Sequence, residues 1–217
     1  MPSARDGRLA ALRTRAEELL RAGECGASAW ARAERVYALA RQLARQEEAD
    51  RFVVGVTALL YQLPEGERER QLAWLDLPDA ATLAVREALV GVLGGVTRGA
   101  SLESRVLWDA ARLDQLGATG IAGSLLEGAG AAGEWHERLD PFALMRELAP
   151  ERYAVDRLYA RVATLPQEMQ TPTARGLAMR RAGIMLFFLE ALREEFAEGL
   201  PDAMLPEGDW LVPREAE

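Results

Sequence analysis

Apolar residues in this chain recur every three or four positions, and no segment alternates apolar and polar residues with the period of two typical of strands. A spacing near 3.6 residues is that of an α-helix with one buried face. The clearest run contains Trp30, Ala33, Val36, Ala40 and Leu43, with arginine and glutamate between them. The pattern predicts an all-α protein.

Capping residues, glycines and prolines divide this pattern into helices. In the first half we predict helices over 7–22, from an N-cap at Ser28 to beyond residue 43, over 50–61, and from Pro78 to about residue 93. A further helix is predicted from Ser101 to a C-cap at Gly117. The last two are predicted over 150–165 and, after an N-cap at Thr171, over 172–198. Residues 52–61 are rich in β-branched side chains, which also suit a strand. Because no partner strand is found, we predict a helix buried on most faces.

The remaining segments are predicted to be irregular. Residues 65–70 are polar, 72–77 form a short apolar patch, and 128–133 form a glycine and alanine loop. We expect residues 1–199 to form one helical domain and residues 200–217 an extended tail, because Pro201, Pro206 and Pro213 oppose regular structure. The tail would pack on the domain through Trp210 or reach a neighbouring chain.

Charge and cysteine content narrow the classes of function. A net charge of −8 argues against non-specific binding to nucleic acid, which needs a basic surface. The single cysteine, Cys25, excludes an internal disulfide and suits a reducing cytosol. The first residues lack the apolar core of a signal peptide, and the longest apolar run, 52–61, is too short to span a membrane. We therefore expect a cytoplasmic protein without a membrane partner.

The stretch Leu107–Gly123 reads as a helix ending at a glycine, followed directly by a helix of small residues. Its string ARLDQLGATGIA, residues 111–122, resembles one in the HD-domain phosphohydrolases, specifically the bacterial branch of predicted HD-superfamily hydrolases. Strings of that branch are also similar to ERVY at 34–37, ALL at 58–60, DPF at 140–142 and scattered positions over 165–181. The resemblance covers residues 25–198 and implies a single HD-domain-like helical bundle.

The resemblance also implies where a catalytic site would lie. In that family a histidine, an adjacent His-Asp pair and a distant aspartate hold a divalent metal ion that activates water. At these positions this chain has Ser28 or Arg32, then Tyr61 and Gln62, and finally Ala111. A further family histidine falls among residues 94–96, which are Gly, Gly and Val. We therefore expect no metal and no other cofactor in this chain.

The one histidine of the chain, His136, cannot supply the several imidazoles that such a site needs. It lies in a polar segment, and we interpret it as exposed or locally hydrogen-bonded. A rebuilt carboxylate site is the alternative, with Asp109 as a weak catalytic candidate that could bind Arg112 or a magnesium ion. Glu103 and Asp114 do not share a helix face with Asp109.

Several retained side chains suggest binding without hydrolysis. Arg112 and Arg181 lie in the resembling strings, and a guanidinium suits phosphate. With Arg32, Tyr61 and Gln62 they would line the pocket that a metal occupies in the family.

We therefore hypothesise a degenerate HD-domain protein that binds a phosphorylated small molecule or nucleotide as a ligand-binding or regulatory module, with a homodimer as one possible assembly. The alternatives are a metal-dependent phosphohydrolase built around Asp109 and an interaction protein that docks through its tail.

Overall fold

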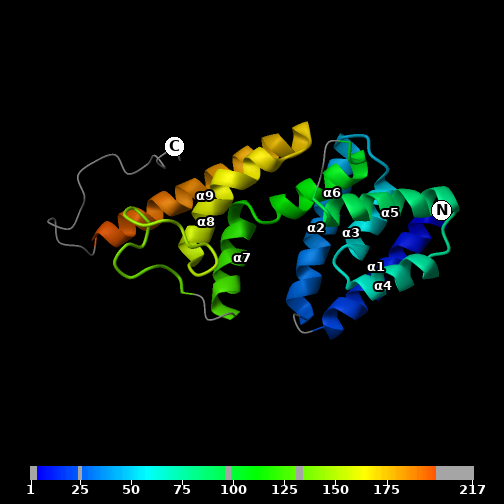
Figure 1. Ribbon diagram of the computed structural model, residues 1–217, viewed down its shortest axis with the longest axis horizontal. Coiled ribbons are helices and arrows are strands. Elements are labelled where there is room, and N and C mark those ends of the chain that lie inside the picture. Colours follow the sequence, from blue (N-terminus) through cyan, green and yellow to red (C-terminus); the bar gives the residue numbers. More distant parts are fainter. Residues whose placement is uncertain (1–3, 24–25, 96–98, 131–133, 199–217) are drawn as a thin grey trace. The chain divides into compact units, whose positions relative to one another are not determined.

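The computed structural model describes residues 4–23, 26–95, 99–130 and 134–198. These residues form nine α-helices and one 3₁₀ turn, and the β-structure among them is one isolated bridge between Glu134 and Tyr153 (Figure 1). The prediction of an all-α protein is confirmed. No helix within the described ranges has both the length and the apolar character needed to cross a membrane.

The chain divides into two compact units. Unit 1 comprises Met1–Gln115 and Leu165–Met179, and unit 2 comprises Leu116–Thr164 and Arg180–Glu217. The predicted tail, residues 200–217, lies outside the described residues, so the domain limits of 1–199 and 200–217 stay a prediction.

Unit 1 is built around a central buried helix. Its elements are α1 (Ala4–Ala22), α2 (Gly26–Gln46), α3 (Arg51–Leu60), α4 (Glu65–Trp74), α5 (Asp79–Leu93), α6 (Leu102–Leu113), the 3₁₀ turn η1 (Leu165–Glu168) and the start of α9 (Pro172–Glu198). Helix α3 contacts α1, α2, α4, α5 and α6, and every residue from Phe52 to Leu60 is buried. The β-branched segment is thus a helix buried on most faces, as predicted.

Local capping chemistry sets several helix starts where we predicted them. The Asp50 carboxylate accepts hydrogen bonds from the backbone N–H groups of Phe52 (2.8 Å) and Val53 (3.2 Å) at the start of α3. Ser101 does the same for Ser104 N–H (3.2 Å) at the start of α6. Such caps satisfy N–H groups that the first helical turn leaves without partners.

Two predicted caps are wrong. Helix α2 begins at Gly26, so Ser28 lies inside its first turn and cannot be the N-cap. Helix α6 ends at Leu113 with Asp114 as its C-cap, and Gly117, with a φ of 73°, instead begins the next helix, α7 (Gly117–Gly130). A glycine with positive φ lies at a helix boundary, because this conformation is not that of an α-helix. Gly117 therefore indicated a boundary between two helices, but not whether it ends the first helix or begins the second.

Two segments are more helical than predicted. The polar segment and part of the apolar patch form α4, which follows Pro64, carries Glu65 and Glu67 in its first turn and buries Gln71 and Leu72. Helix α7 continues through Gly130, into the predicted glycine loop; residues 131–133 lie outside the described ranges. Packing against neighbours stabilises helices whose own propensity is weak.

Unit 2 contains α7, α8 (Ala154–Thr164) and the rest of α9. Two arginines of α8 hydrogen-bond to α7. Arg157 donates to the Ser124 carbonyl (3.1 Å), and Arg161 donates to the Ser124 hydroxyl (2.6 Å). The loop before α8 is held by Arg146, which pairs with the fully buried carboxylate of Asp156.

We predict that Gly91→Ala destabilises unit 1. A Cβ at Gly91 on α5 would lie 2.3 Å from the Ser104 hydroxyl and 2.7 Å from its Cβ on α6. Overpacking costs about 1–3 kcal/mol, partly offset by the higher helix propensity of alanine. We expect a net loss of about 1–2 kcal/mol in urea unfolding. Gly7→Ala, where a Cβ meets open space on α1, should be neutral or stabilising; an equal loss in both variants would contradict the prediction.

Candidate functional site

The candidate site lies where the first turns of α2 approach the end of α6. Arg35 makes a bidentate pair with Asp114, with Nε 2.8 Å from Oδ1 and Nη2 3.1 Å from Oδ2. Arg32, one turn earlier on α2, brings its Nε to 4.0 Å from the same carboxylate. The Asp114 side chain is only 8% exposed, whereas those of Arg32 and Arg35 are 45% and 47% exposed. Two guanidinium groups therefore face solvent around one buried carboxylate.

This cluster carries a persistent positive charge. The hydrogen bond that Arg35 donates to the Asp114 carboxylate raises the pKa of Arg35 above its already high value, so Arg35 stays protonated. The bidentate pair uses two of the five Arg35 donors, and the longer Arg32 contact occupies its guanidinium less completely. Donors of both side chains remain available to an anion.

Arg112 lies on α6 and is held by other partners. Its Nε donates to Glu168 of η1 (2.6 Å), and its guanidinium stacks on the Trp108 indole. Its side chain is 22% exposed. Arg112 thus links α6 to η1 in unit 1.

Tyr61 and Gln62 follow the end of α3. Tyr61 is the C-cap residue, is partly buried and packs against the apolar cluster that includes Trp30 of α2. The Nε2 atom of Gln62 is buried without a hydrogen-bond partner. Ala111, at the position of the family's last aspartate, is 6% exposed. The sequence suggested that these positions line one pocket. Among the described contacts, Arg35 donates hydrogen bonds to Asp114, and Arg32 forms a longer ion pair with the same carboxylate, with 4.0 Å between its Nε and Oδ2.

Asp109 is a buried anchor. It is 0% exposed, and its carboxylate accepts hydrogen bonds from the N–H of Gln170 (2.8 Å), the N–H of Thr171 (2.8 Å) and the Thr171 hydroxyl (2.7 Å). Burial raises the pKa of Asp109, and these three donors oppose the shift. The carboxylate holds the start of α9, and its bond to Arg112, considered from the sequence, is not formed among the described contacts.

The other two candidates belong to unit 2. The stem of Arg181 packs on Gly117, where an added Cβ would come within 3.2 Å of the Arg181 Cγ. The Nδ1 atom of His136 donates a hydrogen bond to the Glu137 carbonyl (2.8 Å), and the ring packs edge-on against Phe196. His136 is therefore locally hydrogen-bonded, which was one of the two interpretations of its sequence position.

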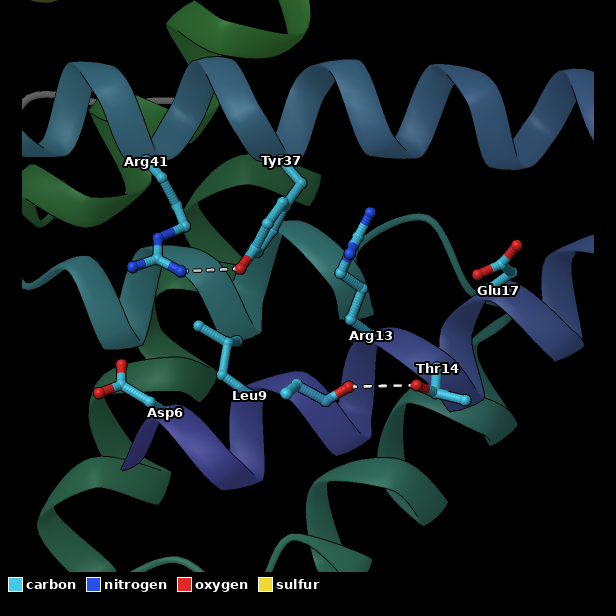
Figure 2. Close-up of a pocket in the computed structure, with 8 residues that line it drawn as sticks. Asp6, Leu9, Arg13, Thr14, Glu17, Tyr37 and Arg41 are labelled. Carbon is cyan, nitrogen blue, oxygen red and sulfur yellow. Dashed lines mark hydrogen bonds between the residues drawn. The ribbon is translucent and has the colours of Figure 1, made fainter. Parts of the chain in front are cut away.

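A separate pocket of about 340 Å³ lies between α1 and α2, where Figure 2 shows Tyr37 and Arg41 of α2 above the α1 side chains. Arg41 donates to the Tyr37 hydroxyl (2.9 Å). The remaining lining residues all come from α1: Asp6, Leu9, Ala10, Arg13, Thr14 and Glu17. Two acidic and two basic side chains give this pocket no net preference for an anion, unlike the arginine cluster.

The pairing of Arg35 with Asp114 was not predicted from the sequence. The signal was present, because both residues lie in strings that carry the family resemblance, ERVY and ARLDQLG. Their separation of 79 residues hides the contact from any local pattern. In the described part of the chain, no three histidine, cysteine, aspartate or glutamate side chains form a group that could hold a metal ion.

The fold of this chain is similar to the folds of several solved structures. No protein-family model matches the sequence. YpgQ of Bacillus subtilis, an uncharacterized protein, is 29% identical over 191 residues, covering 76% of this chain and 83% of YpgQ. The crystal structure of YpgQ in complex with ADP matches with a TM-score of 0.72 at 24% identity, over 89% of this chain and 97% of that one.

An HD-superfamily hydrolase of Bacillus thuringiensis matches with a TM-score of 0.74 at 21% identity, over 89% of this chain and 99% of the hydrolase. A Listeria innocua protein matches with a TM-score of 0.73 at 19% identity, over 92% of this chain and 100% of that protein. The protein therefore has the all-α, HD-domain-like fold that the sequence predicted.

We predict that Asp109→Ala strongly destabilises the protein. It leaves three buried donors without an acceptor, and hydrogen bonds to a charged group are worth about 1.5–3 kcal/mol each. Urea unfolding should show a loss of about 3 kcal/mol or more. Glu87→Ala, an exposed carboxylate on α5, serves as the control and should change stability by less than about 0.5 kcal/mol. Similar losses in the two variants would contradict the anchoring role.

The raised pKa of Asp109 also predicts a pH dependence. Its folded-state pKa lies above the ordinary value of 3.8, so its contribution to stability is complete below pH 3.8 and is lost as pH rises through the folded-state pKa. The stability advantage of the wild type over the non-titrating Asp109→Asn should therefore shrink from about pH 4 toward neutrality. Urea unfolding at a series of pH values measures it. An advantage that grows with pH would show that the hydrogen bonds outweigh burial.

Proposed function

We propose that this protein binds a nucleotide or another phosphorylated small molecule without hydrolysing it through a metal, and acts as a ligand-binding or regulatory module on an HD-domain-like fold. The observation that carries the proposal is the cluster of Arg32 and Arg35 around Asp114. It lies beside positions where the resemblance places the metal ligands of the hydrolases.

The chemistry of the cluster suits a phosphate group. Guanidinium groups donate in a planar fork that matches phosphate oxygens, and charge-assisted hydrogen bonds of this kind are among the stronger ones. Asp114 orients Arg35 by a bidentate pair and leaves Arg32 nearly half exposed, so Arg32 can turn toward a ligand at little cost. We assign Arg32 the main contact with phosphate and Arg35 a supporting contact.

The same residues do not fit a divalent metal ion. Such an ion takes carboxylate, imidazole or other neutral or anionic donors. The positions matched to the family's ligands hold a serine or an arginine, a tyrosine, a glutamine and an alanine. The carboxylate of the cluster, Asp114, is already engaged by Arg35, and two guanidinium charges would repel a cation.

A known relative supports the choice of ligand. The YpgQ structure whose fold this chain shares contains ADP. ADP combines a phosphate group, which arginines recognise, with a base that can stack on an aromatic ring. We therefore use ADP as the probe, with Tyr61, Gln62 and Arg112 of unit 1 as further candidate contacts that mutation can test one by one; Arg181, also named from the sequence, belongs to unit 2.

The alternative, a phosphohydrolase with a metal at Asp109, lacks a favourable observation. Both carboxylate oxygens of Asp109 already accept hydrogen bonds, and the side chain has no exposed surface. A metal ion would have to displace the backbone donors of Gln170 and Thr171, at a cost of several hydrogen bonds.

Calorimetric titration with ADP tests the proposal. We expect saturable binding by the wild type and roughly tenfold weaker binding by Arg32→Ala, equivalent to about 1.4 kcal/mol. Arg45→Ala is the matched control, because Arg45 is an exposed arginine near the other end of the same helix. Equal loss in both variants, or no binding by the wild type, would reject the arginine cluster as the site.

The same samples distinguish binding from hydrolysis. Incubation of ADP with the protein and Mn²⁺ or Mg²⁺ should leave ADP intact in a phosphate-release assay and by chromatography. Metal-dependent turnover that Asp109→Asn abolishes, in a variant still folded by circular dichroism, would establish the alternative instead.

A further inference from the structure

The loop between α7 and α8 in unit 2 exposes several large apolar side chains. Over residues 139–148, here called the apolar loop, Leu139 is 77% exposed and Met145 92%, and Leu144 and Leu148 are exposed as well. Phe187 on α9 is also exposed, but the exposed residues that follow it on that helix are all glutamates. Exposed apolar surface that is concentrated in one place commonly marks a contact with another segment or molecule.

Hydrogen bonds fold the apolar loop into a compact turn. The Asp140 carboxylate accepts hydrogen bonds from the backbone N–H groups of Leu144 (2.8 Å) and Met145 (2.9 Å). The Asp140 carbonyl accepts a further bond from the Arg146 guanidinium (3.2 Å). These bonds keep Leu139, Leu144 and Met145 close to one another. The apolar surface is therefore formed in advance, which lowers the entropy that a contact with it must overcome.

The apolar loop lies against the end of α9. The Phe142 ring meets the Phe196 ring edge-on, with 5.4 Å between the ring centroids. Helix α9 ends at Glu198, two residues after Phe196, so residues 199–217 begin beside the apolar loop. Leu200 can lie no more than about 14 Å from Phe196, because four residues of fully extended chain span no more than that.

Residues 199–217 carry apolar side chains that could cover this surface, namely Leu200, Met204, Leu205, Trp210, Leu211 and Val212. A segment tethered so close to its binding surface has an effective concentration on the order of millimolar, which favours it over a separate molecule with the same side chains. We propose that residues 199–217 dock on the apolar loop of their own chain and cover Leu139, Leu144 and Met145. Of the two roles that the sequence suggested for the tail, this proposal selects packing on the domain.

The charge of the apolar loop is compatible with this occupant. Residues 199–217 carry five carboxylates and one arginine. Residues 138–148 carry two arginines and two carboxylates, so this stretch has no net charge with which to repel an acidic segment. Apolar contact rather than ion pairing then stabilises the docked segment, and raising the salt concentration should not release it.

Oxidation of methionines by hydrogen peroxide tests the contact in the full chain. Met145 should oxidise more slowly than Met179 of unit 1, although Met145 is 92% exposed and Met179 only 64%. In the full-length double variant Leu205→Ser, Trp210→Ser, we expect the initial rate of Met145 oxidation to rise at least about fivefold, with no change at Met179. Peptide mass spectrometry measures the rate at each methionine.

The double variant Ala203→Ser, Ala216→Ser is the matched control, because it adds two serines to the same segment and keeps the large apolar side chains. Met145 should stay protected in it. Met185 of α9 is fully buried, so slow oxidation of Met185 shows that unit 2 is folded in each variant. Equal rates at Met145 in the wild type and in Leu205→Ser, Trp210→Ser would overturn the proposal. Protection that disappears on dilution from about 100 μM to about 1 μM would also overturn it, because the segment would then come from a second copy.

Discussion

The buried carboxylate of Asp109 connects parts of unit 1 that the sequence places far apart. Three donors from Gln170 and Thr171 converge on it, 61 and 62 residues along the chain. Glu47 adds a hydrogen bond from Thr173 N–H (2.8 Å), so two carboxylates cap the start of α9. Negative charge at a helix N-terminus is favourable because it meets the positive end of the helix dipole. Helix α9, which continues into unit 2, thus begins at a position defined by α2 and α6.

Helix α6 serves both structure and the candidate site. Asp109 points inward to α9, Arg112 pairs with η1, and Asp114, directly after the helix, engages Arg35 of α2. These contacts give the residues of the HD-like string a structural role. Its aspartates and arginines hold helices together. The proposed ligand binding depends on other side chains, the arginines of α2 that remain exposed, because function depends on the site and not on the scaffold.

Local features were predictable because neighbouring residues create them. The Asp50 and Ser101 caps, Pro172 at the first position of α9, and the buried α3 follow from residue order alone. Ser28 was assigned wrongly because a serine near a helix start fits several positions, and the chain enters the helix two residues earlier, at Gly26. Helix α4 was missed because its polar sequence shows no clear apolar stripe, and packing of Gln71 and Leu72 stabilises it.

The candidate site was only partly predictable. Arg32 was chosen from the sequence, but the bidentate pair of Arg35 with Asp114 spans 79 residues and depends on how α2 crosses α6. Arg112 and Asp109 were also chosen, and the structure gives each a partner of its own: Glu168 for Arg112, and Gln170 and Thr171 for Asp109. Side-chain partners over such separations follow from helix packing, which residue spacing does not encode.

The sequence by itself determined that the chain is helical and where several of its helices begin, and its single histidine led to the prediction of a site without a metal. These properties depend on residue type and on contacts within a few positions. Only the tertiary structure decided that Asp109 is a buried anchor, that Arg35 forms a bidentate pair with Asp114, and that Phe187 remains exposed on α9. Each of these depends on which helix faces meet, because burial and hydrogen bonding arise between residues that are distant in the chain.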